Sequence, residues 1–370
     1  MSDRRRLIAR VAMIALVAVL LWLPQYAEAF WLQTGLFAMS AAIGAIGLQL
    51  LVGITGQLSL AHAFFVAVGA YGYCFLAGGA PGGGIEAPSG AQLPPVLAMI
   101  GAVLIAGALG GLFSPIAGRL SGIYLGLASI GLVFIGQHVL FNAKGVTGGF
   151  NGRDAEPFSL FGFSFSNSHP DLTVFGVPYG GLERLWYLGL ALVALSIWYA
   201  RNLTRSRPGR ALQTVRDSEI AAAVMGVNVP VYRAAAFVVS SMYAGLAGVF
   251  LALAFGRVVP ESFGFLLSID FLVMIVLGGL GSIRGAVAGA LVVTALPQLF
   301  DHYSGSLPFV TAPGGDGLQP ADAARFLYGA AVVAVLIFAP QGLAGLSRGL
   351  VGRRAAPDQS VRTDTKESTA

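Results

Sequence analysis

The chain has 370 residues, of which 56% are hydrophobic and only 11% are charged. Soluble domains carry about 25% charged residues, so this composition excludes an ordinary soluble domain, and the mean hydropathy of +0.77 indicates that lipid is the main solvent. The net charge of +5 does not indicate nucleic-acid binding, because the basic residues lie in short connections between apolar runs, where they act as topology signals.

Apolar runs follow one another along the chain at the length of membrane-spanning helices, which is about 17–25 residues. Ten ranges are candidates: 8–24, 30–51, 57–78, 93–113, 120–140, 184–200, 233–255, 264–281, 285–300 and 324–340. We therefore predict an all-α, polytopic membrane protein with about ten transmembrane helices. Two of the later ranges are short and rich in glycine, which leaves open a broken or re-entrant helix among them.

The basic residues test this count. With the N-terminus in the cytoplasm, alternating crossings place 17 of the 22 Lys and Arg residues on the inner side, as the positive-inside rule expects. The charges do not test the crossings in the front half of the chain, because no Lys or Arg occurs between Arg10 and Arg119. We expect both termini in the cytoplasm.

The first 29 residues are either an anchor helix or a signal-like segment. A basic start, the apolar run Val11–Leu23 and the sequence Ala27-Glu28-Ala29 together resemble a cleavable signal peptide. Both alternatives leave the later crossings unchanged. Residues 30–345 then form the membrane domain, and residues 346–370 form a polar cytoplasmic tail that we expect to be disordered.

A polar interruption follows the second apolar run. It reads Gly53-Ile-Thr-Gly-Gln-Leu-Ser-Leu-Ala-His62, and its two glycines permit a break in the helix. The polar residues either line a passage or hold helices together, and the sequence does not decide between these alternatives. The candidates for the passage are Gly56, Gln57, Ser59 and His62.

Two connections are long enough to carry function. The outer loop, 141–183, is rich in Gly, Phe and Ser, and the inner loop, 201–232, is the most charged stretch of the chain. In the inner loop, Ser206 can cap a helix that Gly226 can end. Its apolar residues Leu212, Val215 and Ala222 fall on one face, so we predict a helix at the cytoplasmic surface with one side free for a partner.

Two features of the later spans have competing interpretations. Asp270 lies inside an apolar run, where a carboxylate is a functional candidate by default, but a position near the outer interface would explain it as well. The run from Gly278 to Gly285 is either a second break or a tight inner turn, and Arg284 favours the turn.

Enzyme chemistry has no support in the sequence. There is no GxxxxGK[ST] run for binding ATP, and the four histidines have no metal-ligand spacing. The single cysteine, Cys74, allows neither an intrachain disulfide nor a cysteine metal cluster. We predict no catalytic, cofactor or metal site.

Five blocks of sequence resemble one family, the permease subunits of high-affinity branched-chain amino-acid ABC importers, and in particular their longer, M-type subunit. The blocks are Gly53–Tyr71, Ser121–Ala128, Lys144–Gly152, Gly209–Asn228 and Val276–Gly285. The fourth and fifth are specific, and the others are suggestive. Two shorter runs, Phe326–Gly329 and Pro340–Leu343, look familiar as well, and the resemblance covers roughly residues 35–345.

The resemblance implies a bacterial inner-membrane importer with four kinds of component. The chain would pair with a companion H-type permease, two cytoplasmic ABC ATPases and a periplasmic substrate-binding protein. The inner loop looks like the segment that couples to an ATPase, although Glu219 and Gly226 are seven residues apart where the common pattern has six. The residues implied for coupling are Arg210, Arg216, Asp217, Glu219, Ala221, Ala222 and Gly226.

The resemblance also implies a role for the outer loop and a substrate class. Thr147, Gly148, Gly149 and Asn151 are candidates for an outer gate or a contact with the binding protein. The expected substrates are leucine, isoleucine and valine. Related permeases carry urea, short amides or aromatic acids, so these stay alternatives. An ion-driven secondary transporter is a further alternative, but it should place ionisable residues deep in several spans, and only Asp270 is arguable.

Overall fold

The structure of the protein is a computed structural model. It describes residues 3–79, 89–120, 122–160, 162–165, 172–174 and 177–303, together with positions 326, 329–330, 332–334, 337 and 342–345. The polar tail predicted over 346–370 lies outside the described residues.

Nine of the ten predicted ranges coincide with apolar helices, and most of the tenth, 324–340, lies outside the described residues. Within the described part, six helices are long and apolar enough to cross a membrane, and three shorter apolar helices accompany them. The helices are α1 (Asp3–Trp22), α2 (Ala29–Leu48), α3 (His62–Ala77), α4 (Pro95–Arg119), α5 (Ile123–Asn142), α7 (Gly181–Arg205), α10 (Val229–Phe255), α11 (Phe265–Gly278) and α12 (Ile283–Tyr303).

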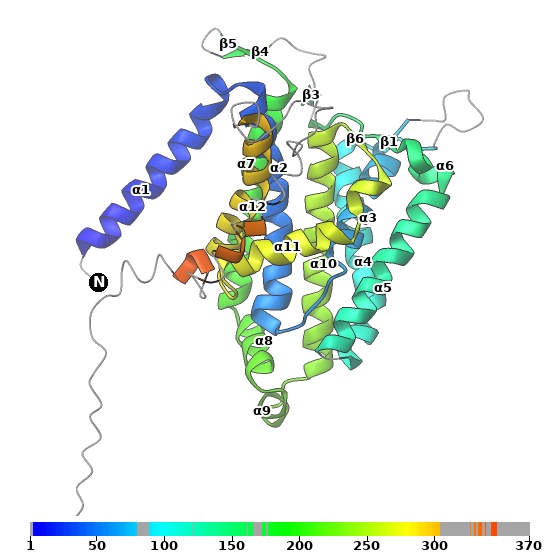
Figure 1. Cartoon of the computed structure of the whole chain (residues 1–370), viewed down its shortest axis with the longest axis vertical. Helices are drawn as coiled ribbons and strands as arrows, with labels where there is room; N and C mark the ends of the chain where they lie inside the picture. The colour runs from blue at the N-terminus through cyan, green and yellow to red at the C-terminus, as the bar shows by residue number, and fades with distance from the viewer. Residues whose placement is uncertain are drawn as a thin grey trace, which may run out of the picture.

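The centre of the bundle is formed by α2 and α10, which each carry more buried residues than any other described helix up to α11 (Figure 1). The helix α10 packs against α2, α3 and α4, while α11 and α12 pack against α2. Small residues permit this close approach: a Cβ added at Gly248 of α10 would lie 1.9 Å from the carbonyl oxygen of Val66 in α3. Lipid removes the hydrophobic drive between helices, so such close packing is what holds them together.

The helix α1 lies at the side of the bundle (Figure 1). Its described apolar side chains are largely exposed, and a short 3₁₀ helix, η1 (Leu23–Gln25), links it to α2. Two side chains of α7 tie its last turn to the bundle. The Trp186 indole donates to the carbonyl of Leu20 at 2.9 Å, and the Tyr187 hydroxyl donates to that of Leu21 at 3.0 Å.

One end of the bundle carries two short helices, α8 (Arg207–Asp217) and α9 (Glu219–Val224), and we call it the α8–α9 end (Figure 1). The C-terminal turn of α4 and the turn between α11 and α12 belong to the same end, because Gly118 faces Pro230 and Gly281 faces Arg216. This grouping agrees with the alternation expected from the charges.

The opposite end carries the short strands, and we call it the strand end. Strand β1 (Arg153–Asp154) pairs antiparallel with β6 (Arg257–Val258), β2 (Ser159–Leu160) with β3 (Phe163–Ser164), and β4 (Leu172–Val174) with β5 (Val177–Tyr179). Two single turns, α6 (Lys144–Thr147) and η3 (Gly149–Asn151), precede β1, and a third, η4 (Pro260–Phe263), precedes α11. Within the predicted outer loop, 141–183, the described residues between α5 and α7 therefore form small hairpins and turns.

The third predicted span differs most from the structure. We expected a helix from residue 57, but α3 begins at His62, and residues 56–61 are not helical. Before them, α2 widens into a π-helical stretch, η2 (Gln49–Ile54). Gly56 then adopts a φ of +72°, which an L-residue avoids and which ends the helical path. The break that the glycines permitted is therefore present.

Candidate functional site

The segment at the α8–α9 end forms two helices, not the single helix that the sequence predicted. Ser206 caps the first as expected, because its hydroxyl accepts the backbone N–H of the third residue after it at 3.3 Å. Ser218 has an extended backbone and caps a second helix by accepting the N–H of Ala221 at 3.2 Å. A serine that bonds to a later N–H starts a new helix, which is why the single-helix prediction was wrong.

The two helices nevertheless share the buried face that the sequence predicted. Leu212 and Val215 of α8 and Ala222 of α9 are all buried against the bundle. Gly226 ends the segment with a φ of +83°, as expected of a glycine at a helix terminus. The segment is thus fixed to the membrane helices along one side.

The other face of α9 is apolar and exposed. Ile220, Val224 and Met225 are exposed to 80%, 83% and 74%, and Ala221 lies on the same open side. We call these four residues the α9 patch. The sequence analysis included Ala221 but did not single out the three larger side chains. Clustered exposed apolar side chains are typical of a surface that contacts another protein or a membrane.

Ion pairs and charge-assisted hydrogen bonds fix the charged residues of this segment. Glu219 pairs with Arg233 near the start of α10, and the Arg233 side chain is only 12% exposed. Arg210 donates to the carbonyl of Arg205 at 2.9 Å and so stays within the segment. Asp217 pairs with Arg216 at 2.9 Å.

Arg216 also joins α8 to the break that follows α2. Its Nη1 donates to the carbonyl of Gly53 at 3.0 Å, across 163 positions of sequence. Gly56 lies under the same side chain, where an added Cβ would come within 3.0 Å of Arg216 Cγ. A residue predicted for coupling and a residue predicted for the passage are therefore in contact.

A glycine turn between α11 and α12 completes this junction. Gly279 and Gly281 have φ values of +103° and +81°, so the run is the tight turn that Arg284 favoured. The turn lies against η2, because a Cβ added at Gly53 would be 2.8 Å from the nitrogen of Gly281. The buried side chain of Gln49 points at the turn as well, where the backbone N–H of Ser282 can donate to its oxygen at 2.7 Å.

The residues of the break other than Gly56 are buried or half-buried, and hydrogen bonds join the break to neighbouring helices. Gln57 donates to the hydroxyl of Thr55 at 3.0 Å and to the carbonyl of Arg233 at 3.4 Å. The backbone N–H of Leu60 donates to Ser129 of α5 at 2.8 Å. Such bonds stabilise irregular backbone at membrane depth, where no water is available to do so.

Two polar atoms of the break lack a partner among the described residues. They are Oε1 of Gln57 and Nε2 of His62, both buried. The imidazole of His62 packs edge-on against the ring of Phe271, with centroids 4.8 Å apart. Ser59 is buried and accepts the N–H of Ala61 at 3.4 Å. Gln57, Ser59 and His62 are thus buried in the bundle, whereas Gly56 is exposed at the α8–α9 end beside Arg216.

The outer-loop candidates form a tight turn at the strand end. Thr147 donates to the carbonyls of Leu140 at 2.6 Å and Ala143 at 2.9 Å, and Gly148 and Gly149 both have positive φ. The Asn151 carbonyl accepts two hydrogen bonds from Arg257, at 2.7 and 3.0 Å. Thr147 and Gly149 are buried, whereas Asn151 is exposed.

Two further residues of this turn were not singled out from the sequence. Phe150 is 74% exposed and so presents a large aromatic ring to the surroundings. Arg153 is buried and donates to the carbonyls of Ser89 at 2.8 Å and Val146 at 2.7 Å. Burial lowers the pKa of its guanidinium. Its place directly after the third family-like block was the available signal.

A cavity of about 630 Å³ lies between α2, α10, α11 and α12. It is lined by Phe37, Ser40 and Ala41 of α2; Leu251 and Phe255 of α10; Ser262 of η4; Leu266, Leu267, Asp270, Phe271 and Met274 of α11; and Val293, Thr294, Pro297 and Gln298 of α12. Asp270, which the sequence left between two interpretations, is thus a half-buried wall residue of this cavity.

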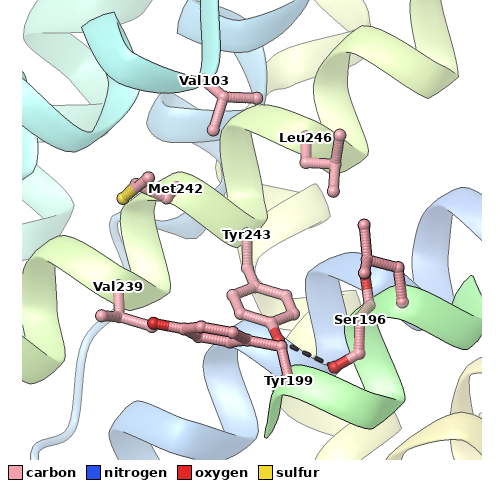
Figure 2. Close-up of a pocket in the computed structure, with 8 residues that line it drawn as sticks. Val103, Ser196, Tyr199, Val239, Met242, Tyr243 and Leu246 are labelled. Carbon is pink, nitrogen blue, oxygen red and sulfur yellow. Dashed lines mark hydrogen bonds between the residues drawn. The ribbon is translucent and has the colours of Figure 1, made fainter. Parts of the chain in front are cut away.

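A smaller cavity of about 240 Å³ lies between α4, α7 and α10 (Figure 2). Its walls are apolar apart from hydroxyl groups, and Figure 2 shows the ring of Tyr243 beside Tyr199 with its hydroxyl directed at Ser196. That hydroxyl donates to the carbonyl of Ser196 at 2.8 Å. No charged residue lines this cavity, which distinguishes it from the one that contains Asp270.

Comparison with known proteins decides the class. The family described as "Branched-chain amino acid transport system / permease component" matches residues 31–336. This chain belongs to that family. It is 31% identical over 316 residues to the high-affinity branched-chain amino acid transport system permease protein LivM of Salmonella typhimurium, with 82% of this chain and 67% of that protein covered.

Further relatives agree with the same assignment. LivM of Escherichia coli K12 is also 31% identical over 316 residues, with the same coverage of both chains. LivH of the same organism is 27% identical over 268 residues, which cover 71% of this permease and 82% of LivH. No solved structure matches this permease. The family resemblance found in the sequence, including its M-type character, is confirmed, and the permease is a multi-pass membrane transport subunit.

Proposed function

We propose that this permease is one of two membrane subunits of an ABC importer that moves branched-chain amino acids into the cytoplasm. ATP hydrolysis on separate ATPase subunits drives the transport. The observation that carries the proposal is the 31% identity over 316 residues to LivM, whose name specifies high-affinity branched-chain amino acid transport. The likeness to LivH as well supports a companion permease of the H type.

The α8–α9 segment is the proposed contact with an ATPase. The α9 patch supplies an exposed apolar surface, and the buried face of the segment makes it move with the bundle. The Glu219–Arg233 pair links α9 to α10, and the Arg216–Gly53 bond links α8 to η2. Closure of two ATPases would then pass into the membrane helices as rigid-body motion.

The orientation follows from this assignment. The α8–α9 end faces the cytoplasm, with both termini on that side, and the strand end faces the periplasm. Thr147, Gly148, Gly149 and Asn151, together with the exposed ring of Phe150, then form part of the surface for a periplasmic binding protein. Gly56, Gln57, Ser59 and His62 belong to the passage between the two ends.

The test has two parts. Purification of the tagged permease from native membranes in mild detergent, followed by mass spectrometry, should recover a second permease and two P-loop ATPases. The recovered complex, placed in proteoliposomes with its binding protein and internal ATP, should accumulate leucine. Recovery of the permease alone, under conditions that preserve a known ABC complex, would favour an ion-driven transporter instead. ATP-dependent uptake of urea, a short amide or an aromatic acid in place of leucine would replace the substrate.

A further inference from the structure

We propose that the cavity between α4, α7 and α10 holds an acyl chain of a membrane phospholipid, and that this chain sets the spacing of the two helices that carry the α8–α9 segment (Figure 2). The cavity measures about 240 Å³. Lipid binding at this place is independent of the substrate assigned to the importer, because the cavity lies apart from the break at residues 56–61.

The cavity lies at a depth where the bundle crosses hydrocarbon. Its lining residues are Val103 of α4; Leu195, Ser196 and Tyr199 of α7; and Val239, Met242, Tyr243 and Leu246 of α10. Each of them lies at least six positions inside its helix, which at 1.5 Å per residue is about 9 Å or more from the nearest helix end. Headgroups and bulk water lie beyond this level, so the molecules that reach the cavity from the side are acyl chains.

The walls of the cavity favour hydrocarbon over water or a zwitterion. Apart from hydroxyl groups the lining is apolar, and the Tyr243 hydroxyl is already bonded to the carbonyl of Ser196 at 2.8 Å. One buried atom of the wall, Ser196 Oγ, lacks a partner among the described residues, whereas a buried water makes about three hydrogen bonds. An amino acid would leave both of its charges unpaired here, because no charged residue lines the cavity.

The rim of the cavity is typical of a surface that faces lipid. Leu195 lines the cavity and is 56% exposed, so the cavity opens on the side of the bundle. Residues next to the lining in sequence, Leu104 of α4 and Trp198 of α7, are large, apolar and exposed as well. Contacts between membrane helices are enriched instead in Gly, Ala, Ser and Thr, which permit close approach. These bulky side chains therefore favour fluid acyl chains over a companion permease at this rim.

The same cavity separates the helices at the two ends of the α8–α9 segment. The helix α7 runs into α8, and α10 follows α9, so the segment is held between them. At the level of the cavity, the hydrogen bond from Tyr243 to Ser196 joins α10 to α7. A chain seated beside this bond would resist closer approach of the two helices, because packed interiors are hardly compressible. The spacing of α7 and α10 would thereby depend on the lipid.

Retention of lipid during purification tests the proposal. The permease, with the subunits that accompany it, is purified from native membranes, washed extensively in mild detergent and examined by native mass spectrometry. We expect a phospholipid to stay bound, since a chain inside a cavity exchanges with detergent more slowly than one at an open surface. Leu246→Phe narrows the cavity and should lower the bound phospholipid several-fold. The matched control Leu104→Phe makes the same change at an exposed position outside the lining and should retain it.

A second filling variant guards against a failure of the first to assemble. Val239→Phe narrows the cavity from another position on α10 and should lower the bound phospholipid as well. Full retention of phospholipid in an assembled Leu246→Phe or Val239→Phe permease would overturn the proposal, as would the absence of bound phospholipid from the unchanged permease.

A phospholipid with a diazirine in the middle of its acyl chain tests the position. After illumination in nanodiscs, adducts should form at Tyr199 and Met242 in preference to Leu104. Leu246→Phe should lower the adducts at Tyr199 several-fold and leave those at Leu104 unchanged. Adducts spread evenly over all three positions, or unaffected by Leu246→Phe, would indicate ordinary contact with surrounding lipid and overturn the proposal.

Cysteine crosslinking tests whether a protein covers the cavity instead. Leu195→Cys in a Cys74→Ala background places a single thiol at the opening. In the assembled complex this thiol should react with a lipid-soluble maleimide as readily as Leu104→Cys does in the same background. A crosslink from Leu195→Cys to a second permease subunit would show that this face is a subunit interface and overturn the lipid assignment.

Discussion

Arg216 of α8 donates a hydrogen bond to the carbonyl oxygen of Gly53 at 3.0 Å, and this bond joins the segment at the α8–α9 end to the broken part of the membrane core. The Gly53 carbonyl belongs to η2, so it lies where the helical ladder is already irregular. The guanidinium thus holds a position in the backbone that could otherwise shift. If the α8–α9 segment contacts an ATPase as proposed, motion of α8 would be transmitted to the break through this bond.

Replacing Arg216 with Ala should therefore uncouple transport from ATP hydrolysis. The lost charge-assisted bond is worth about 1.5 kcal/mol, the low end of the usual range, because the side chain is 41% exposed. In proteoliposomes, leucine accumulated per ATP hydrolysed should fall several-fold, and Arg216→Lys should recover part of it. Arg207→Ala removes an exposed arginine of the same helix and should leave the ratio unchanged. A normal ratio in Arg216→Ala would show that the bond does not transmit motion.

The ion pair between Glu219 and Arg233 gives a charge-reversal test of the link between α9 and α10. Glu219→Lys places two positive charges together and should lower uptake while membrane insertion stays intact. Glu219→Lys combined with Arg233→Glu should restore uptake, since contacting residues couple by about 0.5–3 kcal/mol. Uptake measured in the two single variants and in the double variant gives the coupling between the two side chains. A double variant no better than the worse single would remove the pair from the mechanism.

Gly56 should tolerate no side chain. Its φ of +72° costs an L-residue about 1–2 kcal/mol, and a Cβ would lie 3.0 Å from Arg216 Cγ. Gly56→Ala should lower the Tm of the detergent-solubilised permease, as followed by a thermal shift assay. Gly131→Ala is the matched control, because nothing lies within 4 Å of that position in α5, where Ala favours a helix by about 0.8–1.0 kcal/mol. A Gly56→Ala permease with the same Tm as the unchanged permease would contradict the strained geometry at this position.

Gln57 and Ser59 should affect transport more than assembly if they belong to the passage. Gln57→Ala and Ser59→Ala remove polar groups from the break, so the rate of uptake should fall while the amount of assembled complex stays normal. Ser114→Ala provides a buried serine control, since its hydroxyl bonds only within its own helix, to the carbonyl of Gly111 at 2.7 Å. Unchanged uptake kinetics in both break variants would favour a structural role for these side chains.

Much of the fold could be predicted from the sequence, because membrane insertion is governed by local composition. The length of the apolar runs predicted nine of the described helices, and the glycines around residue 53 permitted the break that precedes α3. Capping chemistry predicted the start of α8 at Ser206. The same chemistry at Ser218 was overlooked, and so one helix was predicted where two exist.

The candidate site was only partly predictable, because its geometry depends on residues far apart in sequence. Gln49 is one polar residue in an apolar run, and nothing local indicates that it faces the turn at 279–282. The sequence showed each of the family-like blocks around Gly53, Arg216 and Gly281, but it did not show that these three blocks meet at one junction.

By itself, the sequence determined that the chain is a multi-pass membrane protein of this permease family, with alternating ends and a charged segment after α7. These properties follow from apolar length, charge placement and local motifs, each of which acts over a few turns of helix. Only the tertiary structure decided that Asp270 lines a cavity with Thr294, and that Arg216 reaches Gly53. Those relationships arise from close helix packing, where small residues fix which faces meet.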